Sequence, residues 1–105
     1  MADAEILMAA MRDKAAVLRR LGYRVRFDLA DTGESVLLDA TGTEPEITAA
    51  EEATEADTVL RLSAESLGRL MAGKLNPMLA FSTGRLRVEG SKGVALKLAS
   101  LLDEA

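Results

Sequence analysis

The side chains of this 105-residue chain that could do chemistry are carboxylates, guanidinium groups and lysine amines, because the sequence contains neither Cys nor His. Their absence removes disulfides, thiol nucleophiles, histidine-based zinc sites and every catalytic triad that needs an imidazole. Catalysis by carboxylates or lysines alone would need a clustered pair, and the sequence suggests none. We therefore predict no catalytic residue, no metal site, no cofactor and no enzymatic activity.

The arginines show a clear pattern among the charged residues. Five of them alternate with apolar residues in predicted strands and should project from the outward face of one sheet: Arg24, Arg26, Arg61, Arg85 and Arg87. Four acids are predicted on the same face: Asp28, Asp39, Asp57 and Glu89. Cross-strand ion pairs are the favoured interpretation, and contact with anionic lipid headgroups or an acidic partner is the alternative.

A second charged segment lies between residues 44 and 57, where six acids occur without a base: Glu44, Glu46, Glu51, Glu52, Glu55 and Asp57. Ile47 is its only strong apolar residue. An edge strand near residues 45–49 followed by a solvated loop is the favoured interpretation, because edge strands tolerate proline and like charge. The alternative is an acidic docking surface.

The composition limits the class of protein further. The net charge of -4 and the presence of only three aromatic residues argue against nucleic acid as a partner. No apolar run is long enough to cross a membrane, and the first residues lack the pattern of a signal peptide. A single cytoplasmic domain over residues 1–105, with one core, is the expectation.

The first half of the chain predicts a helix and a hairpin. Apolar residues recur at helical spacing over residues 3–21, with Asp3 as a possible N-cap and Gly22 as the stop. Alternation over residues 23–29 and again over 36–40 indicates two half-buried strands. The turn at residues 31–33 between them is short, so the two strands should pair antiparallel.

The second half alternates strands and capped helices. A strand over residues 57–63 leads to a helix over 64–72, which Ser63 caps, and Asn76 caps a short helix over 77–82 that begins with Pro77. Gly73 and Gly84 stand where these helices end. A strand over residues 85–89 follows, and Ser91 caps the terminal helix.

The predicted sheet has only one apolar face. The four clearest strands alternate apolar and polar residues, whereas a parallel sheet covered on both faces would show continuous apolar runs. Helices should therefore cover a single face. The fold class is α+β, a two-layer sandwich.

The stretch from Gly73 to Ser91 carries a family resemblance. Its pattern Gly-Lys-Leu-x-Pro-x-x-Ala-x-x-x-Gly-Arg-Leu-x-Val-x-Gly-Ser resembles the C-terminal half of the sterol carrier protein type 2 (sterol-transfer) family, and residues 56–63 extend the likeness. The resemblance implies a five-stranded, mostly antiparallel sheet roofed by helices, with a lipid tunnel between the layers. Members of that family bind fatty acids, fatty acyl-CoAs, sterols or isoprenoid lipids.

The residues predicted to line such a cavity are apolar side chains of the inward sheet face, of the roof over residues 71–81 and of the terminal helix. They are Phe27, Leu29, Val36, Leu38, Leu60, Leu62, Met71, Leu75, Met78, Leu79, Phe81, Leu86, Val88, Leu98 and Leu102. Five methionines in so small a chain suit adaptable packing around a ligand, although the same spacing is found in an ordinary core. Met78, Leu79 and Phe81, bracketed by two glycines, are predicted to form a movable part of the roof.

Two functions follow as alternatives. The first is a non-catalytic carrier of a fatty acid, fatty acyl-CoA or isoprenoid, with transient contact to a membrane surface or an enzyme partner. The second is an interaction or scaffold module with a collapsed cavity, serving a lipid-metabolising enzyme. Residues 101–105 are not a Ser-Lys-Leu-type peroxisomal address, and the Ala-rich, short sequence indicates a stand-alone bacterial member.

Overall fold

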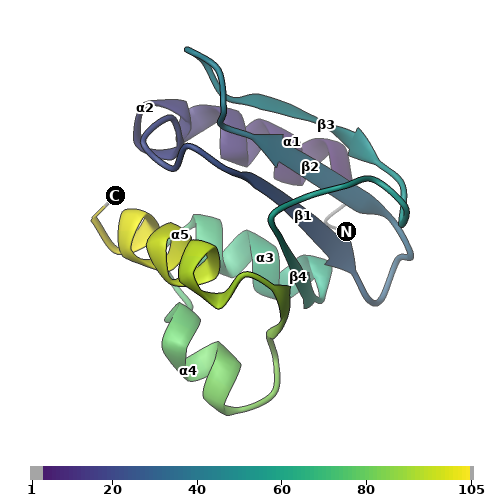
Figure 1. Cartoon of the computed structure of the whole chain (residues 1–105). Coiled ribbons are helices and arrows are strands. Elements are labelled where there is room, and N and C mark those ends of the chain that lie inside the picture. The colour runs from purple at the N-terminus through teal and green to yellow at the C-terminus, as the bar shows by residue number, and fades with distance from the viewer. Residues whose placement is uncertain (1–3, 105) are drawn as a thin grey trace.

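The computed structural model describes residues 4–104, which form a five-stranded sheet with helices packed on one face (Figure 1). The strands are β1 (Arg24–Leu29), β2 (Ser35–Asp39), β3 (Glu46–Ala50), β4 (Thr58–Leu62) and β5 (Arg87–Gly90). The helices are α1 (Ala4–Asp13), α2 (Ala15–Leu18), α3 (Ala64–Met71), α4 (Pro77–Ser82) and α5 (Lys92–Glu104). The predicted two-layer α+β architecture is confirmed.

The sheet has the strand order β3-β2-β1-β4-β5, so the first strand lies at its centre. β1 and β2 form the predicted antiparallel hairpin, with Phe27 opposite Val36. On its other side β1 pairs parallel with β4, which places Phe27 opposite Leu60. The remaining pairs are antiparallel. This register brings the apolar residues of neighbouring strands onto the same face, as alternation requires.

The predicted helix over residues 3–21 is interrupted in the structure. α1 ends at Asp13, Lys14 leaves the helical conformation with φ of -100° and ψ of 13°, and α2 follows as a single turn. The Lys14 amide donates to the carbonyl of Met11, three residues back, and not to the carbonyl four residues back as in a regular α-helix. The proposed Asp3 cap lies outside the described residues. Met11 before the break and Leu18 after it are both fully buried.

The predicted caps in the second half are confirmed. The Ser63 hydroxyl accepts from the Ser66 amide at 3.0 Å, and the Asn76 side chain accepts from the amides of Met78 and Leu79. β5 begins two residues later than predicted, because the amides of Arg85 and Leu86 both donate to the Ala80 carbonyl at the end of α4. The acidic segment contains the predicted edge strand, shifted by one residue to Glu46–Ala50.

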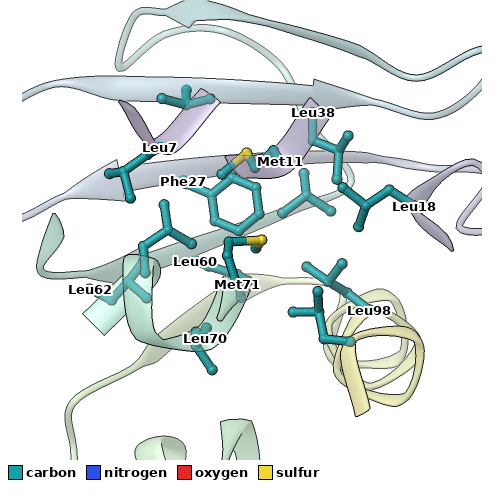
Figure 2. Packing of buried hydrophobic residues seen from close by; sticks show 14 of the residues in the cluster. Leu7, Met11, Leu18, Phe27, Leu38, Leu60, Leu62, Leu70, Met71 and Leu98 are labelled. Atoms are coloured by element: carbon teal, nitrogen blue, oxygen red, sulfur yellow. The ribbon is translucent and has the colours of Figure 1, made fainter. Parts of the chain in front are cut away.

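The core lies between the inward sheet face and the helices. Phe27 is fully buried at its centre, and Figure 2 shows its ring among side chains from the sheet, α1, α3 and α5. α1, with Leu7 and Met11 buried, packs against the side of the sheet formed by β2 and β3. Leu98 of α5 contributes to the opposite half, toward β4 and β5. The two halves of the sheet are therefore roofed by different helices.

Gly90 is predicted to be sensitive to substitution. Its φ is +83°, and a Cβ atom there would lie 2.9 Å from the Asp57 carbonyl oxygen, within the paired backbone of β4 and β5. Gly90→Ala should lower the free energy of unfolding by about 2 kcal/mol or more, measured by urea titration. Gly42→Ala is the matched control, because no atom outside its immediate chain neighbours would approach its Cβ closer than 3.9 Å. Equal stabilities for the two variants would contradict this account.

Candidate ligand-binding pocket

An apolar cavity of about 170 Å³ lies between α4, α5 and the β4–β5 side of the sheet. Phe27, Leu60, Leu86 and Val88 form its wall on the sheet side. Met71 closes it from α3, while α4 and α5 form the two remaining walls. Lys92 is the only charged residue among those that line it. Such a wall shields an apolar ligand from water and provides almost no hydrogen-bond partners for a polar ligand.

Nine of the fifteen sequence-predicted residues line this cavity. They are Phe27, Leu60, Met71, Met78, Phe81, Leu86, Val88, Leu98 and Leu102. Their binding of a lipid stays a prediction, but the structure brings them together around one space. They come from both layers of the sandwich, which is why their proximity depends on the complete fold.

The other six predicted residues lie elsewhere. Leu29, Val36, Leu38 and Leu62 are buried in the core and do not line the cavity. Leu75 is buried in the connection between α3 and α4. Leu79 lies on α4 with 59% of its surface exposed and does not line the cavity. Strand alternation selects a face of the sheet but cannot tell which half of that face a helix fills.

Six lining residues were not predicted from the sequence: Leu70, Pro77, Lys92, Ala95, Leu96 and Ala99. Four of them lie on α5, where positions 92, 95, 96 and 99 fall on one helical face. Two members of that face are alanines, and their short side chains leave the space that a leucine would occupy. The sequence held one signal for this wall: Ala95 and Ala99 are small residues next to the apolar stripe of the terminal helix.

The cavity opens to solvent between α4 and α5. Met78 and Phe81 of α4 and Leu96 of α5 line the cavity and are nevertheless 54%, 47% and 54% exposed. Within the described part of α4 only Ala80 is buried. Figure 1 shows α4 projecting from the body of the protein beside α5. We call Met78, Leu79, Phe81 and Leu96 the mouth residues.

The outward face of the sheet carries ion pairs. Arg26 Nε donates to Asp28 Oδ1 at 2.9 Å, Arg61 lies 3.6 Å from Asp28, and Arg24 pairs with Asp39 at 3.1 Å. Three of the five arginines are thus paired. The pairs of Arg24 and Arg61 cross between strands, as the favoured interpretation predicted, whereas Arg26 and Asp28 belong to the same strand. The other two differ: Arg85 precedes β5 rather than belonging to it, and neither Arg85 nor Arg87 forms an ion pair with a described residue.

These contacts lower two carboxylate pKa values. Burial has the largest single influence on Asp28 and raises its pKa, but hydrogen bonds from Arg26 and Ser35 and the charges of Arg26 and Arg61 together lower it below 3.8. The pKa of Asp39 is lowered mainly by hydrogen bonds from the Thr41 hydroxyl and amide, with a contribution from Arg24. The lowered pKa values indicate structural carboxylates, and neither residue lies at the apolar cavity.

Residues 4–103 match the SCP-2 sterol transfer family. The chain belongs to that family. Membership implies lipid binding or transfer by a fold that is generally a non-catalytic carrier. In the described part of the chain no helix is long and apolar enough to cross a bilayer, and no group of acids could hold a metal ion.

Solved structures of the family share the fold. The sterol carrier protein 2 of Yarrowia lipolytica, in its apo form, has a TM-score of 0.72 and 25% identity, covering 95% of this chain and 89% of that one. The sterol carrier protein domain 2 of Helicoverpa armigera has a TM-score of 0.73 and 24% identity, over 96% and 83% of the two chains. The likeness therefore extends over nearly the whole SCP-2 domain.

The curated relatives are much longer proteins. Hydroxysteroid dehydrogenase-like protein 2 of Xenopus laevis is 37% identical over 54 residues, which cover 51% of this chain and 13% of that protein. The Bos taurus protein of the same name is 30% identical over 80 residues, covering 75% and 19%. The chain thus matches less than a fifth of the length of these relatives.

The buried ion pair between Arg26 and Asp28, on the outward face of the sheet, leads to a prediction. Asp28→Asn should lower the free energy of unfolding by about 2 kcal/mol at pH 7, because Arg26 is 9% exposed and would lose its charged partner. The pKa of Asp28 is lowered in the folded state, so its contribution is present above pH 4 and is lost as the pH falls through the folded pKa.

Urea titrations between pH 7 and pH 2 measure this effect. The stabilities of Asp28→Asn and the parent protein should converge at the acid end of the range. Glu46→Gln, on the exposed edge strand, serves as the control and should change stability by less than about 0.5 kcal/mol. A stability difference that persisted unchanged to pH 2 would show that Asp28 acts through its shape and not its charge.

Proposed function

We propose that this SCP-2 domain is a non-catalytic carrier that holds a long acyl, acyl-CoA or isoprenoid chain in the cavity between α4, α5 and the sheet. The observation that carries the proposal is a cavity with walls that are apolar except at Lys92 and with a mouth formed by half-exposed apolar residues. Family membership supports the same function. A cytoplasmic location and a bacterial origin belong to the same proposal.

Apolar burial alone gives enough free energy for useful binding. Each CH₂ group transferred from water is worth about 0.8 kcal/mol, so a sixteen-carbon chain has on the order of 10 kcal/mol before the costs of ordering are subtracted. Micromolar affinity is then realistic. A wall of leucine, methionine and alanine selects for length and apolar character, which suits a carrier that accepts several lipids.

The cavity must enlarge to hold such a chain. Its volume of about 170 Å³ is below the range of roughly 300–1,000 Å³ that is typical of ligand sites. α4 is the element best suited to move, since it is only six residues long and buries only Ala80 among its described side chains. Outward movement of α4 would widen the space between Met78 and the α5 wall.

Filling the cavity should abolish binding without unfolding the protein. Ala99→Phe places a ring in the space beside α5, and we expect the affinity for a fluorescent fatty acid to fall at least tenfold. Ala9→Phe is the control, because residue 9 is exposed on α1 and far along the chain from the cavity. A fluorescence titration measures both, together with the free energy of unfolding. Unchanged affinity in a folded Ala99→Phe variant would place the ligand elsewhere.

Ligand binding should also protect the amides of α4. In the free protein we expect hydrogen exchange at residues 80–83 to be faster than in β1, because α4 is short and largely solvent-exposed. Saturation with palmitate should slow that exchange severalfold and leave α1 nearly unchanged. Exchange measured by mass spectrometry tests this, and protection confined to α1 would contradict a movable α4. An empty protein in native mass spectrometry that also fails to bind palmitate would favour the scaffold alternative.

A further inference from the structure

The charges of this acidic chain are unevenly distributed. Residues 66–98 contain six lysines and arginines and a single acid, Glu89, whereas the rest of the chain contains seven basic residues and sixteen acids. This basic segment includes α4 and the first half of α5, the two helices that flank the opening of the cavity. Positive charge is therefore concentrated where the cavity opens.

Three of these cations lie next to the mouth along the chain. Lys74 precedes α4, Arg85 follows it, and Lys92 begins α5 and lines the cavity. All three are exposed, and none forms an ion pair with a residue that the structure describes. We call them the mouth cations. They contrast with Arg24, Arg26 and Arg61 on the outward sheet face, which are held by carboxylates.

The exposed apolar side chains occur in the same place. The four mouth residues are each about half exposed or more, and they stand on the two helices that flank the opening. Leu79 is the most exposed of them at 59%, and it contributes neither to the core nor to the cavity wall. Exposed apolar residues gathered at one opening indicate an interaction surface.

We propose that this mouth docks on the surface of a bilayer that contains anionic phospholipid. Leu79 and its neighbours on α4 enter the headgroup region, and the mouth cations contact the phosphates, so that the cavity opens directly toward the lipid. The proposal rests on the proposed carrier function and gives it a route by which an apolar chain enters the cavity without crossing water.

Charge complementarity favours an anionic bilayer over a second copy of the chain. A twofold pairing through the mouth would place the mouth cations of both copies near one another, where they would repel. A bilayer surface instead supplies many phosphates to cations that have no ion-pair partner in the described structure. Each cation near an anionic leaflet strengthens binding about fivefold, and salt screens this attraction over roughly 8 Å. The docking is thus expected to be reversible and sensitive to ionic strength.

Vesicle co-sedimentation tests the docking. The parent protein should bind vesicles with 30% phosphatidylglycerol in phosphatidylcholine more tightly than pure phosphatidylcholine vesicles, and less tightly as salt rises. Lys74→Gln combined with Arg85→Gln should weaken that binding about 25-fold, because it removes two cations that each contribute about fivefold. Neither residue lines the cavity, so the cavity wall stays unchanged. The matched control, Lys14→Gln combined with Arg19→Gln, removes the same charge beside α2 and should weaken binding less than fivefold.

A single tryptophan reports on which surface touches the bilayer. The chain has no Trp, so Leu79→Trp provides an isolated probe whose emission should shift to the blue on anionic vesicles. Ala9→Trp, on the exposed side of α1, should show no shift. The proposal is overturned if the parent protein shows no preference for anionic vesicles, if the control pair loses as much binding as the mouth pair, or if only residue 9 responds. A concentration-dependent shift without vesicles would assign the mouth to a second copy and would also overturn it.

Fatty-acid titration in solution separates this proposal from the carrier function. The parent protein and the Lys74→Gln, Arg85→Gln variant should bind a fluorescent fatty acid with the same affinity. If the parent protein takes up no fatty acid, the carrier function fails whatever the vesicles show. If it binds fatty acid but the mouth substitutions leave vesicle binding unchanged, only the docking surface is wrong.

Discussion

Burial of a single apolar sheet face is the constraint on which the rest of this SCP-2 domain depends. The clearest strands alternate apolar and polar residues, so helices cover the apolar face and the charged side chains lie on the other. α1 and α3 close the roof around Phe27, where side chains fill the interior. Toward β5 the cover consists of the short α4 and the alanine-bearing face of α5. The cavity is the part of the interlayer space that these smaller elements leave unfilled.

The sequence could predict local features well because their causes lie within a few residues. Asn76 caps α4 through its own side chain, and Ser63 does the same for α3, so neither depends on distant packing. The break at Lys14 could not be read from periodicity, because apolar spacing continues through it. The break accompanies the tertiary packing of α2 against α5, where Leu18 is fully buried. The cavity wall was only partly predictable for the same reason: alternation placed Leu38 and Leu60 on one face, while the helices decided which of them borders a space.

The arginines show how context separates residues of the same type. Arg26 is buried against Asp28 and also donates to the Thr54 carbonyl, so its charge is used within the fold. Arg85 lies between α4 and β5 in a segment whose single acid is Glu89, and its guanidinium group has no carboxylate partner in the described structure. Strand alternation predicted both on the same outward face. The structure separates them: Arg26 is held by Asp28 and stabilises the fold, whereas Arg85 precedes β5 and stays available to a partner.

The weak packing of α4 and the proposed transport have one physical origin. A tightly packed α4 would bury Met78 and Phe81 completely and would fill the cavity with its own side chains, which would leave no room for a ligand. Here those residues remain half exposed, so moving α4 disturbs few core contacts and the free-energy difference between closed and open states stays small. The exposed apolar surface that results would be a solubility cost in water. Beside a bilayer that surface gains a favourable environment, and cations on both sides of α4 direct it there. A docked α4 would therefore be drawn outward by the same contact that supplies the ligand.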